Sequence, residues 1–182
     1  NSSFSEEMRT LMQEAKSVAQ QYRSPQIGIE HVFVAILKSK QSEYVNQLMS
    51  GNNVDLRKFL YDLESMVMEN ESKTETPEEV EQIEVTPQLN NLLRSAVLHA
   101  KKLLNPLAEP HHLLLATLKD GPSSAGNVVK TMLNNMGITY NSVMAKIQKS
   151  DTLDFHSSKD DFLLSGGDED DDEDRRFGGG AR

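Results

Sequence analysis

The chain contains the same residue pattern twice, and this internal duplication constrains its fold more than any other feature of the sequence. Residues 4–68 align with residues 85–149, at first without a gap and at an offset of 81 positions. A three-residue insertion within 121–126 then changes the offset to 84. Residues of like character coincide at many positions, among them Phe4 and Val85, Met8 and Leu89, Leu11 and Leu92, Ala15 and Ala96, Pro25 and Pro106, His31 and His112, Leu48 and Met132, and Phe59 and Val143.

Both copies begin with the signals of an amphipathic helix. Ser5 and Thr86 carry the hydroxyl group that an N-cap needs, and Pro87 occupies the first helical position, where its missing N–H is harmless. Phe4 precedes its cap in the manner of a hydrophobic staple. Apolar residues then follow at three- and four-residue steps, which predicts a helix with one buried face.

The second helix of each copy is expected to lie in the core. The runs HVFVAIL (31–37) and HLLLATL (112–118) are almost wholly apolar, as suits a short helix in the middle of a small domain. Further helices are predicted at 43–50 and 55–68, and at 123–136 and 139–149 in the second copy. No run alternates with period two over a strand's length, so we expect no sheet. The predicted fold class is all-α, a duplicated four-helix repeat with eight helices.

Negative charge is concentrated in two segments. Of a net charge of −9, residues 69–84 contribute seven acidic and one basic residue, and residues 151–182 contribute eleven acidic and four basic residues. Segments of this composition bury too little apolar surface to offset the entropy lost on ordering. We therefore expect an acidic linker at 69–84 between repeats at 4–68 and 85–150, and a flexible acidic, glycine-rich tail at 151–182. The tail lacks the EF-hand spacing of calcium ligands.

The sequence carries no signature of catalysis. It has no Walker A motif, no G-x-S-x-G nucleophile elbow and no cysteine. We expect no catalytic residue in this chain. The absence of cysteine and of an N-terminal apolar run predicts a cytoplasmic protein, and no apolar run is long enough to cross a membrane.

The two boxes that open the buried helices resemble a known family. With Gly-x-Glu-His at 28–31 and Glu-Pro-x-His at 109–112, the duplicated pattern resembles the N-terminal domain of Clp ATPases. IGIEHVFVAIL (27–37) is similar to the ClpC form of the box, and AEPHHLLLATL (108–118) is similar to the form in ClpB and ClpA. The resemblance covers residues 4–149. It implies that the eight helices form a pseudo-twofold bundle.

The resemblance also implies a function. Such a domain docks protein adaptors and unfolded or tagged protein substrates for an AAA+ unfoldase, to whose first ATPase ring the acidic tail would lead. The parent protein would be a homo-oligomeric ring, with or without a Clp peptidase, whereas this domain alone would be monomeric. It would hold no cofactor, because ATP and Mg²⁺ belong to the absent AAA+ modules.

The two boxes depart from the family pattern. Ile29 stands where a threonine usually precedes the glutamate, so Gly28 or a backbone turn must open that helix. In the second copy His111 occupies the register of Glu30. Glu109 followed by Pro110 suits the start of a helix, because a carboxylate favours a helix N-terminus and proline fits its first position.

Glu30 has two interpretations. ClpC-type domains recognise phosphoarginine, so the resemblance implies that Glu30 could bind the guanidinium group while free N–H groups of the first helical turn bind the phosphate. The alternative is simple complementation of the helix dipole. His111 is only a degenerate equivalent, because imidazole has no charge complementary to guanidinium.

The paired histidines favour a structural role. His31 and His112 each precede a buried apolar run, which suggests a shared hydrogen bond to the preceding turn. The alternative is a zinc site formed by His99, His111 and His112 with Glu109. Adjacent residues on a helix point about 100° apart, whereas metal ligands prefer spacings of three or four, so we expect no metal.

Two other functions fit parts of the sequence. The segment QQYRSPQIGIEHVF (20–33) has the outline of a helix-turn-helix, but the helix after the turn is too apolar to present side chains to DNA bases. Acidic segments beside the second copy would also repel phosphate, so we expect no nucleic-acid partner. A stand-alone interaction or adaptor protein without ATPase activity is the other alternative.

Overall fold

The computed structural model describes residues 3–39, 42–69, 83–121 and 127–150. Its contacts divide the chain into two compact units, Asn1–Val143 and Met144–Arg182. The first unit contains nearly all of both copies, and the contacts described below lie within it. Most of the expected linker, at 70–82, and the whole expected tail, at 151–182, lie outside the described residues.

The described residues form eight helices, four from each copy, which confirms the predicted fold class. The first copy supplies α1 (Glu6–Gln21), α2 (Ile29–Lys38), α3 (Glu43–Met49) and α4 (Leu56–Met68). The second copy supplies α6 (Pro87–Lys102), α7 (Pro110–Lys119) and α8 (Val128–Asn135), and residues 140–150 are also helical. The sequence predicts a helix at 123–136. Residues 123–126 of that range lie outside the described residues, and α8 covers Val128–Asn135.

Side-chain caps open the first helix of each copy. The Ser5 Oγ accepts a hydrogen bond from the Met8 N–H at 3.0 Å, and the Thr86 Oγ1 accepts one from the Leu89 N–H at 3.0 Å. Pro87 takes the first helical position of α6. Each cap satisfies one of the backbone donors that a helix start leaves without an intrahelical partner.

The same two helices also end alike. Arg23 and Leu104 both adopt positive φ, at 58° and 61°. The Ser24 N–H then donates to the Ala19 carbonyl at 2.9 Å, and the Asn105 N–H donates to the Ala100 carbonyl at 2.8 Å. This is the Schellman arrangement, in which one left-handed residue lets the chain turn back on the last helical turn. Pro25 and Pro106 follow two residues later.

Short parallel pairings tie each copy to the other, and here the expectation of no sheet was wrong. β1 (Gln26–Ile27) pairs with β2 (Glu84–Val85), so the segment before α2 runs beside the segment before α6. The reciprocal pairing joins Phe4 to Ala108, with the Ser5 N–H donating to the Ala108 carbonyl at 3.0 Å. Two residues are too few to produce a period-two pattern, so strands of this length leave no signal in the sequence.

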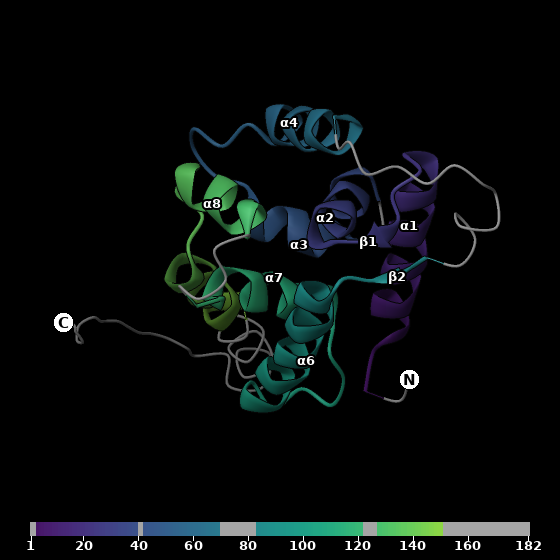
Figure 1. Cartoon of the computed structure of the whole chain (residues 1–182). Helices are drawn as coiled ribbons and strands as arrows, with labels where there is room; N and C mark the ends of the chain where they lie inside the picture. Colours follow the sequence, from purple (N-terminus) through teal and green to yellow (C-terminus); the bar gives the residue numbers. More distant parts are fainter. Residues whose placement is uncertain (1–2, 40–41, 70–82, 122–126, 151–182) are drawn as a thin grey trace, which may run out of the picture. The chain divides into compact units, whose positions relative to one another are not determined.

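Helices α2 and α7 occupy the core. Residues 31–36 of α2 and 112–118 of α7 are all buried. α1 packs on α2 as α6 packs on α7, and the copies meet where α3 contacts α7 and α2 contacts α8 (Figure 1). α4 also packs on α2, on the side away from α6 and α7. On α2 and α7, only Glu30 and His111 near the starts and the residues at the ends escape full burial, whereas α4 exposes several side chains, among them Tyr61 and Met68.

Candidate functional site

The ring of His31 joins the start of α2 to the end of α1. The Gly28 N–H donates to its Nδ1 at 2.9 Å, while its Nε2 lies 3.0 Å from the Ser24 Oγ. Because Nδ1 accepts a hydrogen bond, a neutral ring carries its proton on Nε2. The Nε2–H group then donates a hydrogen bond to the Ser24 Oγ. The side chain is only 2 % exposed, so the ring completes the helix start from inside the protein.

His112 repeats this arrangement in the second copy. The Glu109 N–H donates to its Nδ1 at 2.8 Å, and its Nε2 lies 2.7 Å from the Asn105 Oδ1. Burial, with smaller contributions from His111 and His99, lowers the pKa of His112 to about 3. The ring is therefore neutral at pH 7. Both rings make the hydrogen bond to the preceding turn that the sequence suggested.

The carboxylate of Glu30 lies over the start of its own helix. A Cβ atom built on Gly28 would lie 2.5 Å from the Glu30 Oε1 and 2.7 Å from its Oε2. Glycine at position 28 thus leaves the space that this carboxylate occupies. Gly28 is the N-cap, at φ −107° and without a side chain to cap the helix, so the backbone turn and His31 open α2.

The equivalent place at the start of α7 has different chemistry. Glu109 is the N-cap of α7 but its side chain makes no capping hydrogen bond, and burial followed by the nearby Glu7 raises its pKa. His111 lies edge-on to Tyr44 of α3, with ring centroids 5.1 Å apart, and against His112 at 4.1 Å. Burial lowers the pKa of His111 to about 4, so it offers no positive charge at neutral pH.

His99 belongs to a cluster that the sequence did not reveal. Its Nδ1 lies 2.9 Å from the Ser95 carbonyl, which can only accept, so Nδ1 carries the proton and Nε2 accepts from the Tyr140 hydroxyl at 3.1 Å. The Lys119 Nζ lies 4.7 Å from the centre of the Tyr140 ring. Tyr140 is 41 residues from His99, and no local spacing predicts such a contact. Among the described residues, no three histidine, aspartate or glutamate side chains form a group able to hold a metal ion.

Apolar side chains reach the surface on the second copy. Leu98 is 64 % exposed on α6, and Leu104 and Leu107, in the connection from α6 to α7, are 89 % and 36 % exposed. Isolated exposed leucines are ordinary on protein surfaces, but three within ten positions are a candidate contact area. The corresponding connection of the first copy has Arg23 where Leu104 stands.

A groove of about 330 Å³ lies between the copies, where the start of α4 meets α8. Phe59 of α4 and Met132 and Met136 from α8 and its C-cap give it apolar walls. Asp55 and Asp62 also line it, the latter paired with the Lys58 Nζ at 2.8 Å. Its walls come from both copies, so no local spacing in the sequence indicates which helices form it.

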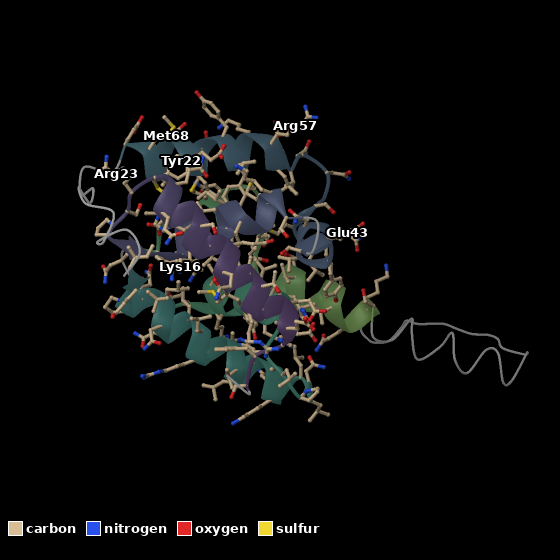
Figure 2. The ribbon with its side chains drawn as sticks, turned by 90° about the vertical axis from the view of Figure 1, so that its right-hand side faces the viewer. Lys16, Tyr22, Arg23, Glu43, Arg57 and Met68 are labelled. Carbon is tan, nitrogen blue, oxygen red and sulfur yellow. The ribbon has the colours of Figure 1, made fainter. Side chains whose placement is uncertain are left out.

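The other end of α4 is fastened to α1 and α2. The Glu64 Oε2 accepts hydrogen bonds from the Tyr22 hydroxyl at 3.4 Å and from the Lys38 Nζ at 3.3 Å. Figure 2 shows Tyr22 and Arg23, which follow α1, near Met68, the last residue of α4. These bonds connect the C-terminal half of α4 to the ends of α1 and α2, while Tyr61 and Met68 of α4 remain exposed.

A known protein family matches most of the chain. The family of the Clp repeat (R) N-terminal domain matches residues 3–132. No curated protein sequence matches the chain significantly. None of the helices in the described segments combines the length and apolar character needed to cross a membrane.

Solved structures of the same fold are distant in sequence. One comes from a study of a malarial protein secretion system, with a TM-score of 0.62, 17 % identity, and coverage of 81 % of this chain and 94 % of that one. The Hsp104 N-terminal domain from Candida albicans has a TM-score of 0.60 and 16 % identity, covering 77 % and 85 % of the two chains. The N-terminal domain of the caseinolytic protease associated chaperone ClpD from Arabidopsis thaliana has a TM-score of 0.56 and 15 % identity, covering 80 % and 95 %.

Proposed function

The chain belongs to the family of the Clp repeat N-terminal domain, and from this membership we propose that it captures adaptors and unfolded or tagged proteins for a Clp-type AAA+ unfoldase. Domains of this family bind substrates and adaptors in general and are themselves non-catalytic. In the proposed mechanism the domain holds a protein non-covalently and hands it to an ATPase ring, where ATP and Mg²⁺ act. A cytoplasmic location and a ring-forming parent protein are parts of this proposal.

The observation that carries the proposal is the exposed apolar area on the second copy. Leu98 and Leu104 are mostly exposed, and Leu107 is exposed over about a third of its surface. Unfolded proteins expose apolar segments, so burial of these segments against the three leucines would stabilise a complex. By contrast, α2 and α7 bury nearly all their side chains, leaving few to read DNA bases as a helix-turn-helix protein would.

Binding to a permanently unfolded protein tests the proposal. A fluorescently labelled, reduced and carboxymethylated protein should bind the full chain, and Leu98→Asn together with Leu104→Asn should weaken binding by roughly tenfold. Asparagine tolerates the positive φ of position 104, so the turn is retained. Val128→Asn, which removes another exposed apolar side chain, is the matched control. Equal binding by the wild type and the double variant would contradict a role for this area.

A finer proposal concerns the start of α2. We propose that Glu30 accepts the guanidinium group of a phosphoarginine side chain. The proposal is supported by the position of its carboxylate at the helix start, where backbone N–H groups also favour a phosphate. The neutral ring of His111 provides no such carboxylate at the start of α7. The proposal therefore assigns one phosphoarginine site to the domain.

Calorimetric titration separates this proposal from a purely structural role of Glu30. Phosphoarginine should bind saturably, plain arginine should bind much more weakly, and Glu30→Ala should abolish the heat signal. Gly28→Ala is a second variant, since its methyl group would displace the Glu30 carboxylate without removing it. If phosphoarginine gives no heat with the wild type, Glu30 only complements the helix dipole.

A further inference from the structure

One flank of α4, beside the groove to α8, carries three carboxylates at a regular interval. Asp55, Asp62 and Glu69 are separated by seven residues each, from the N-cap of α4 to its C-cap. Seven residues make about two helical turns, so these side chains lie along one side of the helix, about 10 Å apart. Together they form an acidic stripe about 21 Å long.

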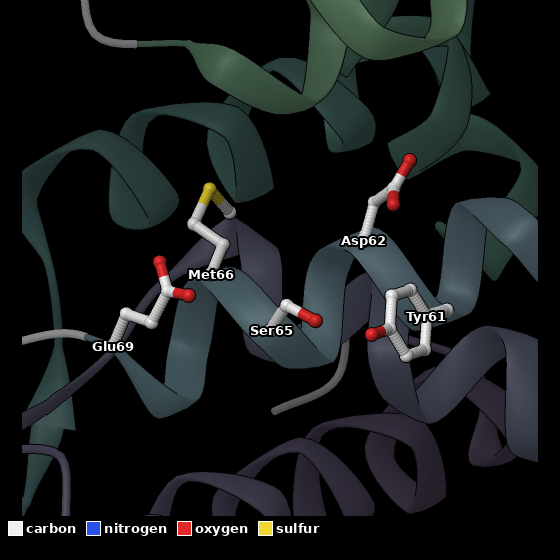
Figure 3. A pocket seen from close by; sticks show the side chains of 5 residues that line it. All are labelled: Tyr61, Asp62, Ser65, Met66 and Glu69. Atoms are coloured by element: carbon white, nitrogen blue, oxygen red, sulfur yellow. The ribbon is translucent and has the colours of Figure 1, made fainter.

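Apolar surface accompanies this stripe along its length. Near its start, the groove between α4 and α8 has Phe59, Met132 and Met136 in its walls. Farther along α4, a second, shallower hollow is lined by Tyr61 and Met66, with the carboxylates of Asp62 and Glu69 beside them (Figure 3). Asp62 lines both hollows, so the two adjoin.

The fold itself does not require these charges. In the second copy Thr139 stands in the register of Asp55, and its Oγ1 accepts a hydrogen bond from the Ser142 N–H at 3.1 Å, so a hydroxyl group serves as the cap equally well. Lys146 stands in the register of Asp62, with the opposite charge. The stripe is therefore a property of the first copy alone.

The ion pair within the stripe is easily exchanged. The Lys58 Nζ and the Asp62 Oδ2 are 2.8 Å apart, but their side chains are 70 % and 39 % exposed. Exposed pairs of this kind contribute little to stability, because water solvates both partners. An arginine from another molecule could replace Lys58, since its planar guanidinium group binds a carboxylate through two parallel hydrogen bonds.

We propose that α4 and the adjoining end of α8 dock an amphipathic helix of a partner protein that carries arginine or lysine at seven-residue intervals beside apolar residues. Side-by-side helices at a small crossing angle repeat their contacts every seven residues, which matches the spacing of the three carboxylates. Flexible methionine side chains can adapt to the apolar residues of such a helix. This inference rests on the proposed function and names the chemistry of one partner class.

A synthetic helix tests the proposal on the full chain. The probe is a fluorescein-labelled peptide of about three heptads, with one arginine and two leucines per heptad on one face. A second peptide has the same composition, but its arginines are distributed around the helix. The Asp55→Thr, Asp62→Asn, Glu69→Gln triple variant removes the stripe and keeps a cap at position 55. The matched control is Glu6→Gln, Glu43→Gln, Glu84→Gln, which removes equal charge from other exposed sites.

Fluorescence anisotropy should show that the stripe variant binds the first peptide at least roughly tenfold more weakly than the wild type, while the control variant stays within about twofold. The rearranged peptide should bind the wild type as weakly as the first peptide binds the stripe variant. In methyl NMR spectra, the signals of Met132 and Met136 should shift on binding, whereas those of Met8 and Met49, both 0 % exposed, should not.

Equal weakening in both triple variants would overturn the proposal, because binding would then follow net charge alone. So would equal affinity for the two peptides, a result that does not depend on the folding of any variant. Capture of the unfolded protein through Leu98 and Leu104 uses a different surface. If the unfolded protein is still captured while the peptide fails to bind, the proposal of a basic helix docked on α4 is refuted and the proposed function is not.

Discussion

At the scale of single residues, Leu104 combines an unusual backbone conformation with almost complete exposure. A side chain at positive φ crowds its own backbone, and at 89 % exposure this leucine has little packing to compensate. We expect Leu104→Gly to raise the free energy of unfolding by about 1 kcal/mol, even though glycine also adds entropy to the unfolded chain. Urea unfolding measures this difference. The preceding C-cap, Leu103, has φ −92°, so Leu103→Gly should instead destabilise the protein.

His111 should make the protein sensitive to mild acid. Its pKa of about 4 in the folded state is below the value near 6.5 of an unfolded histidine, so the unfolded chain binds the proton first. The stability that the neutral ring contributes is complete above about pH 6.5 and is lost as the pH falls toward 4. Between about pH 6 and 5, the unfolding free energy of the wild type should therefore fall more steeply than that of His111→Gln. The difference in slope should be roughly 1 kcal/mol per pH unit. Urea titrations at several pH values give this slope, and identical slopes for both proteins would refute the assignment.

At the scale of secondary structure elements, the start of α6 depends on one hydroxyl group. Thr86→Ala should lower the free energy of unfolding by about 1 kcal/mol, because the Leu89 N–H would lose its acceptor at the helix start. Thr86→Ser keeps the hydroxyl and should cost far less. Thermal unfolding monitored by circular dichroism compares the two, and an equal loss in both would show that the methyl group of Thr86, not its hydroxyl, is responsible.

At the scale of the whole molecule, the two copies hold each other through reciprocal pairings. The segment before α2 pairs with the segment before α6, Phe4 pairs with Ala108, and α3 contacts α7. Cleavage at a protease site introduced within 70–82 should therefore leave both halves associated. Gel filtration should show one species of unchanged size that separates into two fragments only in denaturant. Separation under native conditions would mean that the connecting segment, and not these contacts, keeps the copies together.

Much of the fold could be predicted from the sequence because its signals are local. The duplication, the caps at Ser5 and Thr86 and the apolar runs of α2 and α7 are all visible as spacings of a few residues. The hydrogen bonds of His31 and His112 to the preceding turns were also suggested by position alone. These features recur in both copies, so the same local signals predict both halves of the fold.

What the tertiary structure decided involves residues far apart in the chain. The pairing of His99 with Tyr140, the contact of His111 with Tyr44 and the two-residue strands leave no periodic trace in the sequence, since each partner alone is unremarkable. The groove between α4 and α8 is of the same kind, because its walls come from different copies. Local spacing thus determined which helices form and which faces they bury. Only the packing of one copy against the other decided which side chains remain at the surface for partners, because that depends on contacts between distant segments.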